Sequence, residues 1–132
     1  MTKKILVVED TEDNRQILRD LLGMAGYDMV EAHDGAEGVA KATEHKPDLI
    51  LMDIQMPVMD GYEATRALKA DPALQSVPVV ALTAYAMPHE REQALAAGCA
   101  GHIEKPIDTS TFIATLHTYL LSPPGANLDR GP

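Results

Sequence analysis

Acidic side chains follow two short apolar runs of the sequence. Glu9 and Asp10 come directly after Ile5–Val8, and Asp53 comes directly after Leu49–Met52. Such apolar runs are typical of strands that are buried on both faces of a parallel sheet. Because parallel strands all end at the same edge of a sheet, we expect the three carboxylates to meet there. Oxygen ligands without His or Cys favour Mg²⁺ or Mn²⁺ over zinc.

A hydroxyl group and an ammonium group are expected at the same edge. Thr83 follows the apolar run Val77–Leu82, and Lys105 comes shortly after the weaker run Gly101–Ile103. Two like charges about 4 Å apart repel by about 4 kcal/mol at an effective dielectric near 20. Three clustered carboxylates therefore need more positive charge than Lys105 carries, and a divalent cation supplies it. Taken singly, each of these residues also fits a helix cap, a turn or a solvated loop.

Segments with helical periodicity separate the apolar runs, which suggests five repeats of a strand and a helix. Strand–helix–strand connections are almost always right-handed, so five of them give an open parallel sheet with helices on both faces. The weaker second and fifth runs, Asp28–Ala32 and Gly101–Ile103, are expected nearer the sheet edges. The predicted helices cover about 17–25, 36–43, 60–70 and 88–97, and a last one begins with Asp108 as its N-cap and continues through Leu120.

Length and charge narrow the class of protein. A chain of 132 residues fits one domain. Its net charge of -9 opposes binding to nucleic acid or to an anionic membrane surface. The single cysteine, Cys99, and the lack of a long apolar segment predict a cytoplasmic protein. We expect a domain over residues 1–121 and a flexible C-terminal tail, rich in Pro and Gly, over residues 122–132.

Four motifs together resemble the receiver domain of two-component response regulators, particularly the single-domain kind. The resemblance covers about residues 3–121 and implies a flavodoxin-like α/β fold with strand order 2-1-3-4-5, helices on both faces and a phosphorylation-controlled signalling role. The motifs that carry it are Leu6–Asp10, Asp48–Gly61, Val79–Ala84 and Lys105-Pro106.

The resemblance implies a role for each residue of the acidic group. Asp53 corresponds to the phosphoacceptor, whose carboxylate takes a phosphoryl group from a phosphohistidine. Asp10 and Asp53 correspond to Mg²⁺ ligands, the backbone carbonyl of Gln55 adds another ligand, and Glu9 contributes through a bound water.

Other positions correspond to residues that bind the phosphoryl group or report its presence. Lys105 pairs with Asp53 and then with the phosphoryl oxygen, and Thr83 closes onto the phosphate together with Ala84. Pro106 follows a cis peptide bond that orients Lys105. His102 stands where the family usually has Tyr or Phe, so it is either a switch residue, with a possible pH dependence, or a surface histidine without a role.

The resemblance also implies protein partners. The phosphoryl donor is a histidine kinase or a histidine phosphotransfer protein, and an unknown downstream protein reads the last two helices and the strand between them. Candidate contacts with the donor are Asn14, Ile17, Pro106 and Ile107, although Ile17 equally fits the core.

Several alternatives use the same residues. The same fold is expected if the chain is a receiver fragment of a hybrid kinase or a phosphate sink. A Mg²⁺-dependent phosphohydrolase with an aspartyl nucleophile commonly has a second Asp where this chain has Gln55, and we find no inserted cap. A flavin-binding protein needs a phosphate-binding loop after the first strand, where this chain is acidic. We therefore expect no enzyme activity beyond the protein's own phosphorylation and autodephosphorylation.

Overall fold

The strands form one parallel sheet. The structure is a computed structural model that describes residues 2–54, 61–83 and 88–121. In this part of the chain the sheet has five strands in the order β2-β1-β3-β4-β5, which confirms the predicted order. The strands are β1 (Lys4–Val8), β2 (Asp28–Ala32), β3 (Leu49–Asp53), β4 (Val79–Thr83) and β5 (Gly101–Glu104).

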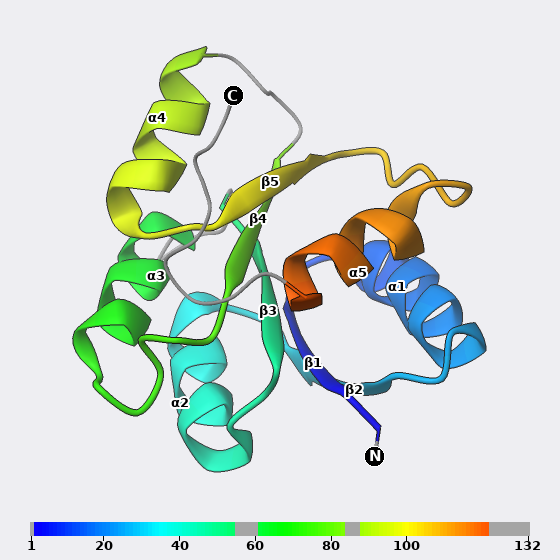
Figure 1. Ribbon diagram of the computed structural model, residues 1–132, viewed down its shortest axis with the longest axis horizontal. Coiled ribbons are helices and arrows are strands. Elements are labelled where there is room, and N and C mark those ends of the chain that lie inside the picture. The colour runs from blue at the N-terminus through cyan, green and yellow to red at the C-terminus, as the bar shows by residue number, and fades with distance from the viewer. Residues whose placement is uncertain (1, 55–60, 84–87, 122–132) are drawn as a thin grey trace.

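Helices cover both faces of this sheet, as Figure 1 shows. Helices α1 and α5 lie on one face, and α2, α3 and α4 lie on the other. This arrangement confirms the predicted doubly wound α/β class. The helices are α1 (Glu12–Met24), α2 (Gly35–His45), α3 (Gly61–Ala70), α4 (Pro88–Ala97) and α5 (Phe112–Leu121).

Alternating residues of the central strands fill a core on each face. Side chains of successive strand residues point to opposite faces. In β3, Leu49 and Leu51 pack with α1 and α5, whereas Ile50 and Met52 pack against the helices of the other face. All four side chains are completely buried, and full burial of such a side chain contributes about 1.5–3 kcal/mol. The middle of the sheet is therefore a rigid support for the residues at its carboxyl edge.

The start of the last helix was predicted wrongly. α5 begins at Phe112, not directly after Asp108. The carboxylate of Asp108 accepts hydrogen bonds from the backbone N–H and the hydroxyl of Ser110, and its carbonyl accepts from the N–H groups of Thr111 and Phe112. Asp108 thus caps a separate turn that leads into the helix.

Within the described ranges, no helix is both long enough and apolar enough to cross a membrane. The predicted tail, residues 122–132, lies outside these ranges.

Candidate functional site

Three carboxylates meet at the carboxyl edge of the sheet, and we call this group the acidic cup. It consists of Glu9, Asp10 and Asp53, and one oxygen atom from each lies within 4.8 Å of the others. The register explains the meeting: Val8 pairs with Met52 in adjacent strands, so Glu9 and Asp53 follow at the same level. Glu9 and Asp53 are 0% and 1% exposed, while Asp10 is exposed to solvent.

Lys105 supplies positive charge to the acidic cup. Its Nζ lies 3.0 Å from Glu9 Oε1 and 3.3 Å from Asp53 Oδ2. Burial lowers the pKa of Lys105, but the carboxylates of Glu9 and Asp53 raise it by more, so its pKa lies above the ordinary value. The Lys105 N–H also donates to the Thr83 carbonyl at 2.7 Å, and the peptide bond to Pro106 is cis, as expected.

Glu9 forms several direct contacts with the protein, more than its expected role of a water-mediated contact with Mg²⁺ requires. Its Oε2 accepts hydrogen bonds from the N–H of Thr11 at 3.2 Å and from Nδ2 of Asn14 at 3.3 Å. Its direct ion pair with Lys105 was not predicted. The sequence suggested Asn14 as a contact with the protein that donates the phosphoryl group. In the structure its side chain also hydrogen-bonds to Glu9.

Arg15 is part of the site's surroundings, and sequence reasoning missed it. This α1 residue is buried, and its Nη1 donates to the backbone carbonyl of Glu9 at 2.6 Å. The signal was present in the sequence, because Arg15, Leu18 and Leu22 share one helical stripe at spacings of three and four. Leu18 and Leu22 are completely buried, but Arg15, at the start of their stripe, lies before the helix that the sequence predicted from about residue 17.

Gly61 brings the start of α3 against the backbone at Asp53 and Ile54. A Cβ atom at this position would lie 2.5 Å from the carbonyl oxygen of Asp53 and 2.5 Å from Cα of Ile54. Real Cβ atoms do not come this close to backbone atoms, so only glycine fits. The sequence motif included Gly61 but gave no reason for it.

Thr83 ends β4, which pairs with β3. Asp53 pairs with Leu82, so Thr83 lies one residue further toward the edge, and it is 2% exposed. Gln55 and Ala84, expected to add a metal ligand and a phosphoryl contact, lie outside the described residues.

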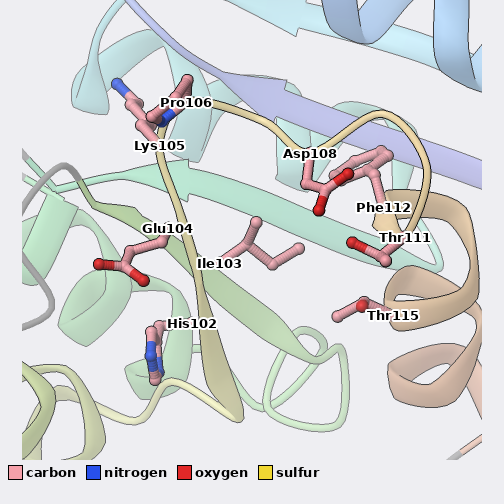
Figure 2. Close-up of a pocket in the computed structure, with 9 residues that line it drawn as sticks. All are labelled: His102, Ile103, Glu104, Lys105, Pro106, Asp108, Thr111, Phe112 and Thr115. Carbon is pink, nitrogen blue, oxygen red and sulfur yellow. The ribbon is translucent and has the colours of Figure 1, made fainter.

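His102 lies on β5 on the side that faces α4. Figure 2 shows that Ile103 points from the strand toward α5, whereas His102 and Glu104 point the other way. Burial lowers the pKa of His102, the positive charge of Arg91 on α4 lowers it further, and Glu104 raises it by less. A pocket of about 570 Å³ lies between β5 and α5, and Ile103, Phe112 and Thr115 are among the residues that line it.

The candidate docking residues lie on the surface to different degrees. Ile17 is 40% exposed on α1, so it is not a core residue. Pro106 is exposed, and Ile107 is half-buried against the core on the α1 and α5 side.

The acidic cup fits a hard divalent cation. Three carboxylates whose oxygen atoms lie within 4.8 Å of one another carry more negative charge than one ammonium group balances. Every donor atom is an oxygen, which is the donor set that Mg²⁺ prefers.

The fold and this edge together define a receiver domain, and comparisons with known proteins agree. The response regulator receiver domain family matches residues 5–117, so the chain belongs to that family. The polar-differentiation response regulator DivK of Brucella ovis is 45% identical over 120 residues, which are 91% of this chain and 98% of DivK.

Solved structures carry the same fold. The chemotaxis protein CheY4 of Vibrio cholerae has a TM-score of 0.87 at 33% identity, and the match covers 90% of this chain and 99% of CheY4. The receiver domain of the sensor histidine kinase PA1611 from Pseudomonas aeruginosa has a TM-score of 0.85 at 35% identity over 92% of this chain and 100% of that domain. A magnesium ion is coordinated in the active-site cleft of that structure.

Proposed function

We propose that this chain accepts a phosphoryl group on Asp53 from a phosphohistidine of a histidine kinase or histidine phosphotransfer protein. A downstream protein then reads the modified state. The observation that carries this proposal is the buried Asp53 carboxylate, which shares one edge with Glu9 and Asp10 and has Lys105 Nζ at 3.3 Å. The proposed location is the cytoplasm.

The transfer is a displacement at phosphorus. An Asp53 carboxylate oxygen forms a bond to phosphorus, the bond from phosphorus to the histidine nitrogen breaks, and the imidazole keeps that electron pair. Lys105 moves its ion pair from the free carboxylate to an oxygen of the phosphoryl group. Asp10, Asp53, the Gln55 carbonyl and, through water, Glu9 would hold Mg²⁺, which would neutralise charge on the phosphoryl group. Pro106 orients Lys105.

The new phosphoryl group changes the charge at the edge. It replaces one carboxylate charge by nearly two charges and three strong acceptor oxygens, to which Thr83 and the backbone at Ala84 donate. A hydrogen bond to a charged group contributes about 1.5–3 kcal/mol. Moving an equilibrium from 1:99 to 99:1 takes about 5.5 kcal/mol, so partner binding supplies the rest. The responding face is α4, β5 and α5, with His102 as its switch residue.

Labelling with a small phosphoryl donor tests the proposal. The protein is incubated with acetyl phosphate and Mg²⁺, and its intact mass is measured. We expect a gain of one phosphoryl group in the wild type that hydroxylamine removes, no gain in Asp53→Asn, and a normal gain in Asp28→Asn. Asp28 is an exposed aspartate at the start of β2, away from the carboxyl edge. A wild type without any gain contradicts the proposal.

A second assignment uses the same chemistry in a larger protein. The receiver of the sensor kinase PA1611 matches this chain about as well as CheY4 does. A receiver of that kind takes its phosphoryl group within a hybrid kinase or serves as a phosphate sink. Rapid transfer from this chain back to a phosphotransfer protein, without a measurable downstream partner, favours that assignment.

A further inference from the structure

Arg15 is an unusual residue for the buried side of a helix. It lies in α1 on the stripe that carries Leu18 and Leu22, and it is 6% exposed. Arginine is almost never fully buried without partners. Three acceptors surround its guanidinium group: Nη1 donates to the Glu9 carbonyl at 2.6 Å, Nη2 donates to Glu12 Oε1 at 2.9 Å, and Nε lies 3.4 Å from Glu31 Oε1.

The bond to Glu9 completes a set of contacts that fixes this residue. The Glu9 N–H donates to the Ala32 carbonyl at 3.0 Å, and its carboxylate is held by Thr11, Asn14 and Lys105. The carbonyl of Glu9 is held by Arg15. That carbonyl belongs to the peptide group that joins Glu9 to Asp10. Arg15 therefore fixes the plane of the peptide from which Asp10 extends.

Asp10 depends on this backbone support more than the other carboxylates of the acidic cup do. It is exposed, and the side-chain contact that the structure gives it is a long one from the Thr11 hydroxyl, at 3.4 Å. Lys105, in contrast, reaches both Glu9 and Asp53. The direction of the Asp10 carboxylate is thus set mainly by the backbone on which it stands.

We propose that Arg15 is a positioning residue of the metal site: through the Glu9 carbonyl it holds Asp10 in the direction required for Mg²⁺. This inference rests on the proposed function, because it needs a cation in the acidic cup. Arg15 touches neither the cation nor the phosphoryl group. Residues that hydrogen-bond to metal ligands from outside typically change metal affinity by about 10–100-fold when they are replaced.

Arg19 is a matched control on the same helix. It pairs with the same two glutamates, through Nη1 to Glu12 at 3.6 Å and Nη2 to Glu31 at 2.7 Å. The structure gives Arg19 hydrogen bonds to Glu31 and Gln16 and none to Glu9 among the residues it describes. Arg15→Gln and Arg19→Gln thus remove the same charge from the same ion-pair cluster, but only the first removes the bond to the Glu9 carbonyl.

In this experiment the loss of charge and the loss of positioning change the Mg²⁺ affinity in opposite directions. Removal of a positive charge near the acidic cup favours Mg²⁺ by Coulomb's law. Loss of positioning weakens Mg²⁺ binding. We titrate Mg²⁺ alone into each variant by calorimetry, after circular dichroism has shown that the variant is folded. We expect about tenfold weaker binding for Arg15→Gln, an unchanged or slightly tighter affinity for Arg19→Gln, and partial recovery in Arg15→Lys, which retains one positively charged donor nitrogen.

Other outcomes overturn the inference. Equal or tighter binding by Arg15→Gln leaves the proposed function standing and removes the positioning role. A wild type that does not bind Mg²⁺ removes both. If Arg15→Gln does not fold, Arg15→Lys is compared with Arg19→Lys. We then expect several-fold weaker binding for Arg15→Lys only, and equal affinities contradict the inference.

Discussion

Lys105 reaches Asp53 across the end of a third strand. Asp53 ends β3 and Lys105 follows β5 directly, with β4 between these two strands, yet Lys105 Nζ lies 3.3 Å from Asp53 Oδ2. β4 ends at Thr83, whose carbonyl accepts the Lys105 N–H. The backbone of Lys105 is therefore hydrogen-bonded to the residue that carries the proposed switch hydroxyl. A change in the charge on Asp53 acts directly on Lys105, whose backbone is hydrogen-bonded to the end of β4.

Removal of the Lys105 charge tests how the acidic cup is balanced. Lys105→Met leaves Glu9 and Asp53 buried without this cation. We expect the free energy of unfolding in EDTA to fall by about 1.5–3 kcal/mol, and saturating Mg²⁺ to stabilise this variant more than the wild type. Urea denaturation with and without Mg²⁺ measures both effects. Lys41→Met, which removes a surface pair with Glu37, is the control. The same Mg²⁺-dependent gain in both variants contradicts the prediction.

Replacement of Gly61 tests the close contact behind Asp53. The added methyl group of Gly61→Ala meets backbone atoms, which cannot move aside as a side chain can. We expect a loss of about 1–3 kcal/mol in the free energy of unfolding and slower labelling by acetyl phosphate. Gly23→Ala is the matched control, because a Cβ there meets nothing within 4 Å and alanine favours the helix. Wild-type stability and labelling in Gly61→Ala would show that the close contact between position 61 and the backbone at Asp53 does not require glycine.

Most residues at the carboxyl edge of the sheet could be predicted from the sequence for a simple reason. Glu9 and Asp53 lie at the ends of buried apolar runs, and parallel strands end together, so their meeting needs only the fold class. The strand order came from the family resemblance, because periodicity does not determine which strands are neighbours. Asp53 and Thr83 belong to the strands themselves, since the hydrogen-bonded ladder continues one residue beyond the last apolar side chain.

The remaining features depend on contacts between residues distant in sequence. The burial of Arg15 requires the Glu9 carbonyl, directly after β1, and Glu31, on β2. A pattern of apolar residues does not show such a partner set. The sequence did not determine whether Ile17 is exposed or buried. It stands next to the buried Leu18, and neighbouring helix positions differ by about 100° around the axis, so Ile17 lies at the border of the apolar stripe.

His102 makes stability depend on pH in a definite direction. Burial and Arg91 lower its pKa in the folded chain. The unfolded chain therefore binds the proton more readily, and the free energy of unfolding decreases as pH falls through the ordinary value of 6.5. Below the lowered pKa this loss is complete and constant.

The variant that tests this effect is His102→Gln. We expect its free energy of unfolding to decrease less than that of the wild type between about pH 7 and about pH 5. His117→Gln, a substitution of another histidine at an exposed position of α5, is the control. Denaturation curves across this pH range make the comparison. An identical slope for His102→Gln and the wild type contradicts the assignment.

A substitution of Ile17 tests whether α1 carries the docking face that the family resemblance implies. A charge at this exposed apolar position disturbs contact with a donor protein but not the acidic cup, so stability changes by no more than about 0.5 kcal/mol. We expect Ile17→Glu to slow phosphotransfer from a donor that labels the wild type by about tenfold or more, and to leave acetyl phosphate labelling unchanged. Met24→Glu is the control, at an 87% exposed position at the far end of α1. Equal slowing in both variants removes the docking role of Ile17.

The most direct test is a crystal structure of the protein with beryllium fluoride and Mg²⁺, in which the fluoride complex stands for the phosphoryl group. We expect beryllium bonded to an Asp53 carboxylate oxygen, a magnesium ion bound by Asp10 and Asp53, and Lys105 Nζ in contact with a fluorine atom. A structure that has these ions in the crystallisation solution, but shows an unmodified Asp53 or the adduct on another carboxylate, contradicts the account.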